Sequence, residues 1–257
     1  MDKDESKMKK ILLTILACTS LLLTACSSGV KADPYSGDNQ VYIYAKAQTY
    51  LHKNDYSDAI TAYQSLDSQY PFEEYSQKGD LSLIYAYYMS DQAALALTSA
   101  ERYIHLYPSD PTVAYAYYMI GVVDFENGRG FLQRRLPYDM AQHNPDNYTA
   151  AFNSFKQVVT NYPDSAYSPD SRRRMMYINN TLGQYQLNVA NFYLSRKAYV
   201  AAASRAQTVL LNYPQTPAVQ GALEVMVQSY QGLGLSELAK NSQAILAKNF
   251  PSDPLAK

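Results

Sequence analysis

The chain has 257 residues, of which 47% are hydrophobic and 18% are charged, so it is long enough to bury a substantial core. Its formal net charge of -1 at pH 7 argues against a nucleic-acid-binding protein, which needs a concentrated basic surface. No strand-like alternation of apolar and polar residues extends over any length, which indicates an all-α fold.

The first stretch of the chain has the pattern of a secretory signal. Lysines at positions 7, 9 and 10 precede an apolar run over residues 11–23, which is too short to span a bilayer. The run ends in Leu23-Thr24-Ala25-Cys26, which resembles the lipobox of bacterial lipoproteins, where the cysteine thiol accepts a diacylglycerol. We predict that residues 1–25 are a signal peptide that is removed and that Cys26 carries the lipid. The alternative is an ordinary cleavage site beside a chance cysteine.

The segment after the cysteine, residues 26–39, is rich in Ser, Gly and Asp and is expected to form a flexible tether. Ser27 occupies the position where an inner-membrane retention signal usually has aspartate, which favours an anchor in the outer membrane. No later segment approaches the run of about eighteen apolar residues that a spanning helix needs. We therefore expect residues 40–257 to fold on the periplasmic face of the membrane.

An aromatic residue followed by proline recurs five times in this folded part. An alanine lies twelve residues before each proline, and an apolar residue lies five before it. Two antiparallel helices per repeat explain the spacing, because the alanine permits a close helix approach and proline ends the second helix. The dipeptides are Tyr70-Pro71, Tyr107-Pro108, Tyr162-Pro163, Tyr213-Pro214 and Phe250-Pro251, and the alanines are Ala59, Ala96, Ala151, Ala202 and Ala239.

These intervals resemble the tetratricopeptide (TPR) pattern. Its first helix carries an aromatic residue twenty-one positions before the proline, and here Tyr50, Tyr87, Tyr193 and Tyr230 stand there. We predict an all-α, TPR-type helical solenoid of five helix-pair repeats. Their ranges are about 40–71, 77–108, 111–163, 169–214 and 217–251.

Two of the repeats are longer than the others, since successive prolines lie 37, 55, 51 and 37 residues apart. The extra residues of repeat three fall across residues 128–146, where glycines and prolines predict a loop insertion. Those of repeat four fall between Pro169 and Arg196, a stretch without another proline, so we expect a first helix lengthened by about four turns. Three first helices are expected to begin with a capping side chain before proline, at Asp110-Pro111, Ser168-Pro169 and Thr216-Pro217.

Two runs of residues carry a more specific resemblance. YPFEEYSQ at 70–77 with IYAYY at 84–88, and YLSRKAYVAAASR at 193–205, resemble the BamD family, the lipoprotein of the outer-membrane β-barrel assembly machine. The lipobox, the repeats and the long helix agree with this resemblance. It implies a scaffold that helps to recognise unfolded outer-membrane proteins and deliver them to the barrel insertase. The insertion around residues 129–147 departs from the family's more acidic counterpart, so no role is carried over for it.

The first helices of TPR repeats present four positions to the concave surface, and in repeats one to three these are largely apolar and aromatic. An exposed apolar groove of this kind suggests a binding site. The resemblance supplies a ligand, the carboxy-terminal targeting strand of unfolded outer-membrane proteins. The alternative is that tight winding buries these residues against neighbouring helices. The predicted groove residues are Tyr44, Leu51, Leu81, Tyr85, Tyr88, Tyr115, Tyr118 and Phe125.

The resemblance also implies a partner surface on the last repeats. There the family's barrel-forming subunit docks its POTRA (polypeptide-transport-associated) domains, and other assembly lipoproteins join the machine. Arg196 and Arg205 match arginines of the family pattern, and arginine suits a carboxylate on a partner. The alternative is a local ion pair within the solenoid. The run Arg172-Arg173-Arg174 is expected to form a solvated helix face.

No catalytic or metal-binding arrangement emerges from the sequence. His52, His105 and His143 lack the spacing of metal ligands, and the one cysteine of the mature chain is expected to be lipidated. We therefore expect no enzyme activity, no cofactor and no metal. The alternatives are a TPR lipoprotein scaffold for pilus or secretin assembly and a cell-wall enzyme, which would need a catalytic acid in a cleft.

Overall fold

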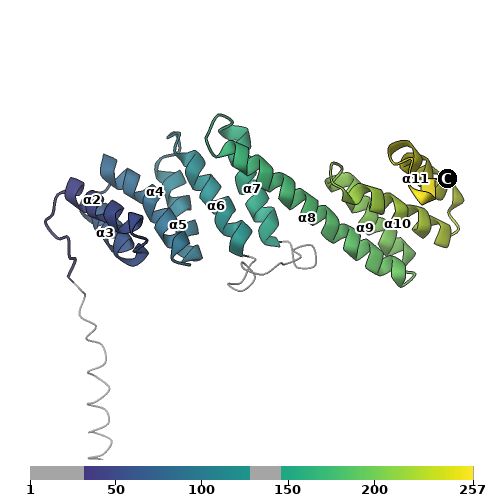
Figure 1. Ribbon diagram of the computed structural model, residues 1–257, viewed down its shortest axis with the longest axis horizontal. Helices are drawn as coiled ribbons and strands as arrows, with labels where there is room; N and C mark the ends of the chain where they lie inside the picture. Colours follow the sequence, from purple (N-terminus) through teal and green to yellow (C-terminus); the bar gives the residue numbers. More distant parts are fainter. Residues whose placement is uncertain (1–31, 128–145, 257) are drawn as a thin grey trace, which may run out of the picture. The chain divides into compact units, whose positions relative to one another are not determined.

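The computed structural model describes residues 32–127 and 146–256 of the chain (Figure 1). The predicted signal peptide, Cys26 and nearly all of the insertion around 129–147 lie outside the described residues, as does the first part of the tether. Residues from Asn39 onward form one compact unit. Within the described residues this unit is helical and contains no strand.

The described helices follow one another in ten segments and a final short 3₁₀ turn, and the predicted all-α fold is confirmed. They are α2 (Gln40–His52), α3 (Tyr56–Gln69), α4 (Glu74–Met89), α5 (Ala93–Leu106), α6 (Val113–Asn127), α7 (Asp146–Asn161), α8 (Ser168–Ser195), α9 (Tyr199–Asn212), α10 (Ala218–Gly232), α11 (Ser236–Asn249) and η2 (Pro254–Ala256).

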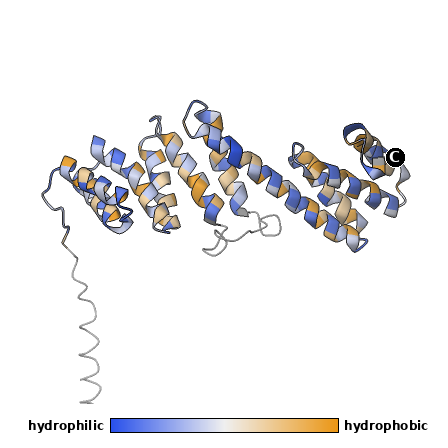
Figure 2. Ribbon diagram, in the orientation of Figure 1, coloured by the Kyte–Doolittle hydropathy of each residue, from blue (hydrophilic) through white to orange (hydrophobic). Residues whose placement is uncertain are grey.

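Each helix packs on the next one along the chain, and the first helices of neighbouring pairs also meet, α2 with α4 and α4 with α6. This is the packing of a TPR-type solenoid (Figure 1). The α6 helix is apolar around most of its surface because α4, α5 and α7 all cover it (Figure 2). The division into five repeats stays a prediction; each range covers one helix pair, except that α4 and α8 begin slightly before residues 77 and 169.

The residues that mark the repeat are the centre of its packing. The five alanines are at most 5% exposed, so the second helix of each pair approaches its neighbours with only a methyl group between the backbones. The apolar residues seven positions later are also buried, and they are Leu66, Tyr103, Val158, Val209 and Leu246. Burial of these side chains supplies much of the stabilisation of each pair.

All five second helices end in the same way at the aromatic–proline dipeptide. The aromatic N–H donates to the carbonyl four residues earlier, as Tyr107 does to Tyr103 at 2.9 Å. The aromatic carbonyl then accepts from the N–H three residues later, as Tyr107 does from Asp110 at 3.0 Å. Proline between them has no N–H to leave unpaired, so the helix stops and the chain turns.

The turns inside the helix pairs are also alike. The carbonyls of Tyr50, Tyr87, Tyr193 and Tyr230 each accept an N–H from five residues later, at 2.9–3.0 Å, and the residue before that donor has a positive φ. This is the Schellman end of a helix, which favours glycine or asparagine at the left-handed position. The chain places Asn54, Asp91, Lys197 and Gly234 there.

The long helix predicted in repeat four is α8, of 28 residues, and it joins two apolar clusters. Ile178 and Leu182 near its middle contribute to a cluster with α6 and α7, and Leu187 and Ala190 further along contribute to a cluster with α9 and α10. Tyr213 touches both clusters. α8 is therefore the main structural connection between the helices before it and those after it.

The predicted capping side chains are only partly correct. The Asp110 carboxylate accepts from the N–H of Thr112 at 2.8 Å, just before α6. Ser168 and Thr216 do not cap α8 and α10. The Thr216 hydroxyl donates to the Tyr213 carbonyl at 2.8 Å, and the Ser168 hydroxyl is buried with no hydrogen-bond partner among the described residues. At these two helices a backbone carbonyl accepts the early N–H instead, that of Tyr167 from Ser171 at 3.0 Å and that of Thr216 from Val219 at 3.2 Å.

Candidate peptide-binding pocket and partner surface

A pocket of about 520 Å³ opens between α2, α4, α6 and the turn before α8. Four of the predicted groove residues line it, namely Leu51, Leu81, Tyr85 and Tyr115. The rest of its lining is Ser82, Pro111, Thr112, Ser165, Ala166 and Tyr167. We call these ten residues the tyrosine pocket. Its size is within the range of pockets that bind small ligands or a few residues of a peptide.

Three tyrosine rings shape this pocket. Tyr167 lies 5.3 Å from Tyr115 between ring centroids and stacks on Tyr118 at 5.1 Å with an interplanar angle of 26°. Tyr85 contacts Tyr56 edge to face at 6.5 Å. Burial raises the pKa of the Tyr115 hydroxyl, so this group stays neutral at physiological pH. The pocket wall is aromatic and uncharged.

The other four predicted groove residues lie outside the tyrosine pocket. Tyr44 packs between Tyr63 and Tyr75, with centroids 6.3 and 5.3 Å away. Tyr88 and Tyr118 are partly buried against the core clusters around them, and Phe125 is only 9% exposed against Tyr148. In this conformation Phe125 belongs to the core, since α7 and α8 cover it.

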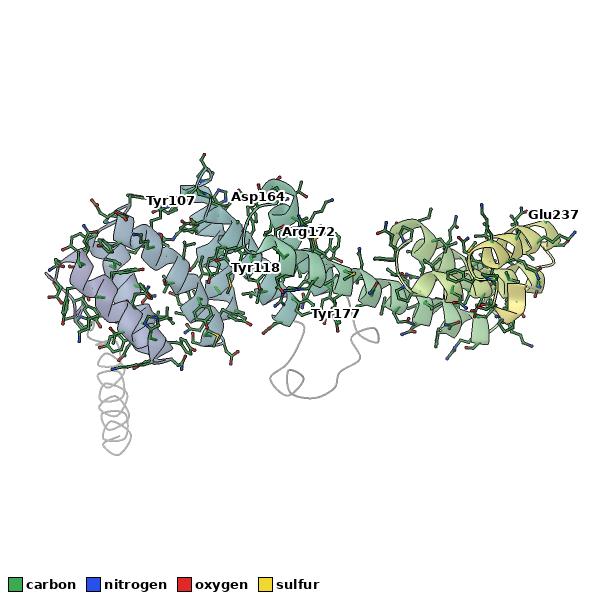
Figure 3. The ribbon with its side chains drawn as sticks, turned by 45° about the horizontal axis from the view of Figure 1, so that its top comes forward. Tyr107, Tyr118, Asp164, Arg172, Tyr177 and Glu237 are labelled. Carbon is green, nitrogen blue, oxygen red and sulfur yellow. The ribbon has the colours of Figure 1, made fainter. Side chains whose placement is uncertain are left out.

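Side chains near the start of α8 hold Tyr118 in place (Figure 3 labels Tyr118 of α6 and Arg172 of α8). The Tyr118 hydroxyl donates to Asp170 at 2.9 Å, and Arg174 donates to the same carboxylate at 2.6 Å. The Arg174 guanidinium also lies 5.9 Å from the Tyr118 centroid and 5.5 Å from that of Phe125. Because Tyr118 stacks on Tyr167, this network supports one wall of the pocket.

The predicted solvated face of Arg172-Arg173-Arg174 is correct for the first two arginines, which are exposed, and wrong for the third. The sequence pattern missed Arg174 because only the folded chain brings three aromatic rings around it. It also missed Tyr167, which precedes α8 and belongs to no first helix. An aromatic residue that falls in a connection gives no periodic signal.

One carboxylate, that of Asp110, is bonded to a lining residue of the tyrosine pocket and directly precedes another, Pro111. Asp110 accepts from the Thr112 hydroxyl at 2.5 Å and from the Gln77 amide at 2.7 Å. The hydrogen bond from the Thr112 side chain is the main cause that lowers the pKa of Asp110, so this carboxylate is ionised at neutral pH. Among the described residues lining the pocket, none carries a charge that could offset it.

The two predicted partner arginines lie on the α8–α9 pair and are both exposed. The guanidinium of Arg196 lies over the Phe192 ring, 4.3 Å from its centroid. Arg205 donates to the Gln186 side chain at 3.2 Å. Within 32–127 and 146–256, neither arginine forms an ion pair.

The part of the chain that the structure describes contains no group of acidic, histidine or cysteine side chains suited to a metal ion. His52 and His105 are exposed on different helices, and His143 lies outside the described residues. No helix within these described residues has the length and hydrophobicity of a membrane span.

Comparison with known proteins places the chain in a family. A family model described as "YfiO: Outer membrane lipoprotein" matches residues 37–245. The outer membrane protein assembly factor BamD of Vibrio cholerae is 36% identical, over 94% of this chain and 99% of that protein. The BamD of Neisseria meningitidis serogroup A is 34% identical, over 96% of this chain and 93% of that protein.

Among solved structures, nearly identical TPR-like repeats from Podosopora anserina align over 83% of this chain and 99% of that one. The sequence identity is 13% and the TM-score is 0.42, which is too distant for any argument about function. The family model and the relatives, by contrast, cover most of the chain at substantial identity. This chain belongs to the BamD family of outer-membrane protein assembly factors.

Proposed function

We propose that the chain is a non-enzymatic scaffold that helps to recognise unfolded outer-membrane proteins and deliver them to the barrel insertase. The observation that carries the proposal is the tyrosine pocket, an apolar opening on the first helices of the solenoid. Such a surface is suited to binding apolar side chains of an extended peptide. Its action is differential binding, with no bond made or broken.

The anchor and the partner complete the proposal. Cys26 carries the lipid that holds the protein to the periplasmic face of the outer membrane, supported by the lipobox and by the description of the family model. Arg196 and Arg205 contact the POTRA domains of the barrel-forming subunit, supported by their exposure and by the absence of ion pairs to them within the described residues. The secretin-scaffold alternative finds no support, because the relatives above are named as assembly factors.

Crosslinking tests the pocket. A photocrosslinking residue in place of Tyr85 should capture a peptide from the last strand of an outer-membrane protein, because Tyr85 lines the pocket. The matched control is Thr98, an exposed residue on α5 outside the pocket, which should capture little. Equal capture at both positions, or none at Tyr85, would remove the pocket from the function.

Charge reversal tests the partner surface. Arg205→Glu should lower co-purification of the barrel-forming subunit while leaving the thermal unfolding temperature unchanged, because Arg205 is exposed and its side chain makes one exposed hydrogen bond to the described residues. Arg172→Glu makes the same charge change at an exposed position of α8 and should leave co-purification intact (Figure 3). If the two variants behave alike, Arg205 has no special place in the interface.

A further inference from the structure

We propose that the tyrosine pocket binds an uncharged, aromatic-bearing stretch inside an unfolded chain and discriminates against a free carboxyl terminus. The inference rests on the proposed function and specifies the part of the substrate that the pocket accepts. A targeting strand at the end of a protein would then be recognised by its internal side chains, with its terminal carboxylate left outside in water.

The lining of the tyrosine pocket offers no counter-ion to a carboxylate. All ten lining residues of the tyrosine pocket are uncharged, and none is Lys, Arg or His. A carboxylate that enters such a site loses its hydration and gains no cation in return, which is unfavourable. A peptide end is therefore better solvated outside the pocket than within it.

Several polar groups of the lining are already bonded within the protein. The Ser82 hydroxyl donates to the Lys78 carbonyl at 3.3 Å, and both the N–H and the hydroxyl of Thr112 donate to Asp110. The Ser165 hydroxyl oxygen accepts from the Tyr167 N–H at 3.2 Å. An anion would thus have to compete with existing bonds for these four donors, the hydroxyls of Ser82 and Thr112 and the N–H groups of Thr112 and Tyr167.

The carboxylate of Asp110 lies within hydrogen-bond distance of the lining residue Thr112. It is ionised, and its partners Thr112 and Gln77 are neutral, so its negative charge is not cancelled by an ion pair. A second carboxylate bound close to Thr112 would meet a like charge in a partly desolvated place. This repulsion adds to the missing cation.

The walls of the pocket attract aromatic side chains. Leu51, Leu81 and Pro111 offer aliphatic surface, and the rings of Tyr115 and Tyr167 offer aromatic edges and faces. Aromatic side chains pack on such rings in offset or edge-to-face arrangements. The volume of about 520 Å³ leaves room for one such ring with its neighbouring backbone.

Four versions of one short β-strand peptide test the proposal on the full mature lipoprotein in detergent. Two versions carry the aromatic residue in the middle, with either a free or an amidated carboxyl terminus; two carry it as the last residue, again free or amidated. With the aromatic at the end, the amide should bind at least about tenfold tighter than the free acid. With the aromatic in the middle, the two should bind equally. Binding is measured by fluorescence anisotropy.

A cation placed in the lining should reverse the preference. Ala166 is exposed and lines the pocket, so Ala166→Lys should fold normally and favour the peptide that ends in an aromatic residue with a free carboxylate. Ala94→Lys, at an exposed position of α5, is the matched control and should leave all four affinities unchanged.

The outcomes separate the inference from the proposed function. If no version binds, or if Tyr85→Asp leaves binding unchanged, the pocket does not receive peptides and both proposals are overturned. If the peptides bind at the pocket and the free terminal acid binds as tightly as its amide, only the further inference is overturned. A lysine-centred peptide that binds more tightly than the aromatic one would overturn it as well, because the pocket would then select a cation.

Discussion

At the scale of single residues, Phe72 has the least favourable backbone conformation for its type. It follows Pro71 in the turn before α4 with a φ of 67°, the left-handed region that favours glycine. Phe72 is 72% exposed, so burial of its ring offsets little of the free-energy cost of this backbone conformation. The corresponding residues after the other four turn prolines are polar and have no positive φ. Phe72 thus lowers the stability of the fold, and its exposed ring adds little packing to compensate.

Replacement of Phe72 by glycine should therefore stabilise the protein. We expect Phe72→Gly to raise the free energy of unfolding by about 1 kcal/mol, because the left-handed conformation costs a non-glycine residue roughly that much. Urea unfolding measures the change. Ser109→Gly, after Pro108 in the next turn, has no such strain to relieve and should give no gain. A loss of stability in Phe72→Gly would mean that the exposed ring makes a stabilising contact.

Asp170 should stabilise the fold at neutral pH and lose this effect in acid. Burial alone would raise the pKa of Asp170, but hydrogen bonds from Arg174, Arg173 and Tyr118 lower it to about 2. Because the folded pKa lies below the ordinary value of 3.8, the stabilisation is complete above about pH 4 and disappears toward pH 2. Asp170→Asn should lower the free energy of unfolding by about 1–2 kcal/mol at pH 7. The difference from the parent should vanish near pH 2 in urea unfolding curves.

Asp80 should show the opposite pH dependence. It is 4% exposed and paired with Arg102, which also contacts Asp67 at 3.0 Å, yet burial outweighs the pairing and raises the pKa of Asp80 to about 6. The folded state therefore holds this proton more tightly than the unfolded state does. Its contribution is largest below about pH 4 and falls as the pH rises toward 6, by up to about 3 kcal/mol. Asp80→Asn should remove that slope, and a parallel pH profile in the two proteins would contradict the assignment.

At the scale of elements, close helix contacts depend on particular small residues. A Cβ on Gly121 of α6 would lie 2.7 Å from the ring of Phe155 on α7, a side chain that is fully buried. The α6–α7 pair can pack this closely only because position 121 has no side chain.

We expect Gly121→Ala to destabilise the protein by about 1–3 kcal/mol through overpacking, even though alanine favours a helix by about 1 kcal/mol over glycine. Thermal unfolding measures the loss. The double variant Gly121→Ala, Phe155→Leu should recover part of it, because the smaller side chain makes room for the new methyl group. Strictly additive effects of the two changes would show that the methyl group and the ring do not meet.

The sequence predicts the contacts that follow from regular spacing along the chain, and it does not predict those that form between distant helices. The alanines, the apolar partners and the turn prolines follow from backbone spacing, so they recur at fixed intervals and predict the helix pairs. Tyr167 and Arg174 lie near the pocket through contacts across three helices, which no interval encodes. Phe125 fits the pattern of an exposed position, but the packing of α7 and α8 places it in the core.

At the scale of the whole solenoid, stability should be divided between two regions that meet on α8. Val209 is fully buried in the cluster of α8, α9 and α10, and Val113 is buried in the cluster of α4, α5 and α6. In repeat proteins each unit is stabilised chiefly by its neighbours, so a local defect is felt most strongly nearby.

Hydrogen exchange should show this division. Val209→Ala, a loss of about 1–3 kcal/mol by cavity formation, should speed amide exchange in α9–α11 and leave α2–α5 nearly unchanged. Val113→Ala is the matched substitution and should do the reverse. Uniform acceleration over all helices in either variant would mean that the solenoid opens as one cooperative unit.

The length of α8 has a consequence for how this chain can diverge. Each residue added to a helix rotates everything beyond it by about 100°, so seven residues, nearly two full turns, restore the original facing while two residues do not. Insertions and deletions inside α8 should survive where they add or remove close to whole turns, such as about seven, eleven or eighteen residues, because these lengths keep Arg205 on the same side of the protein. The allowed lengths of α8 would then be discrete. The distance between the tyrosine pocket and Arg205 would change in steps during evolution, not continuously.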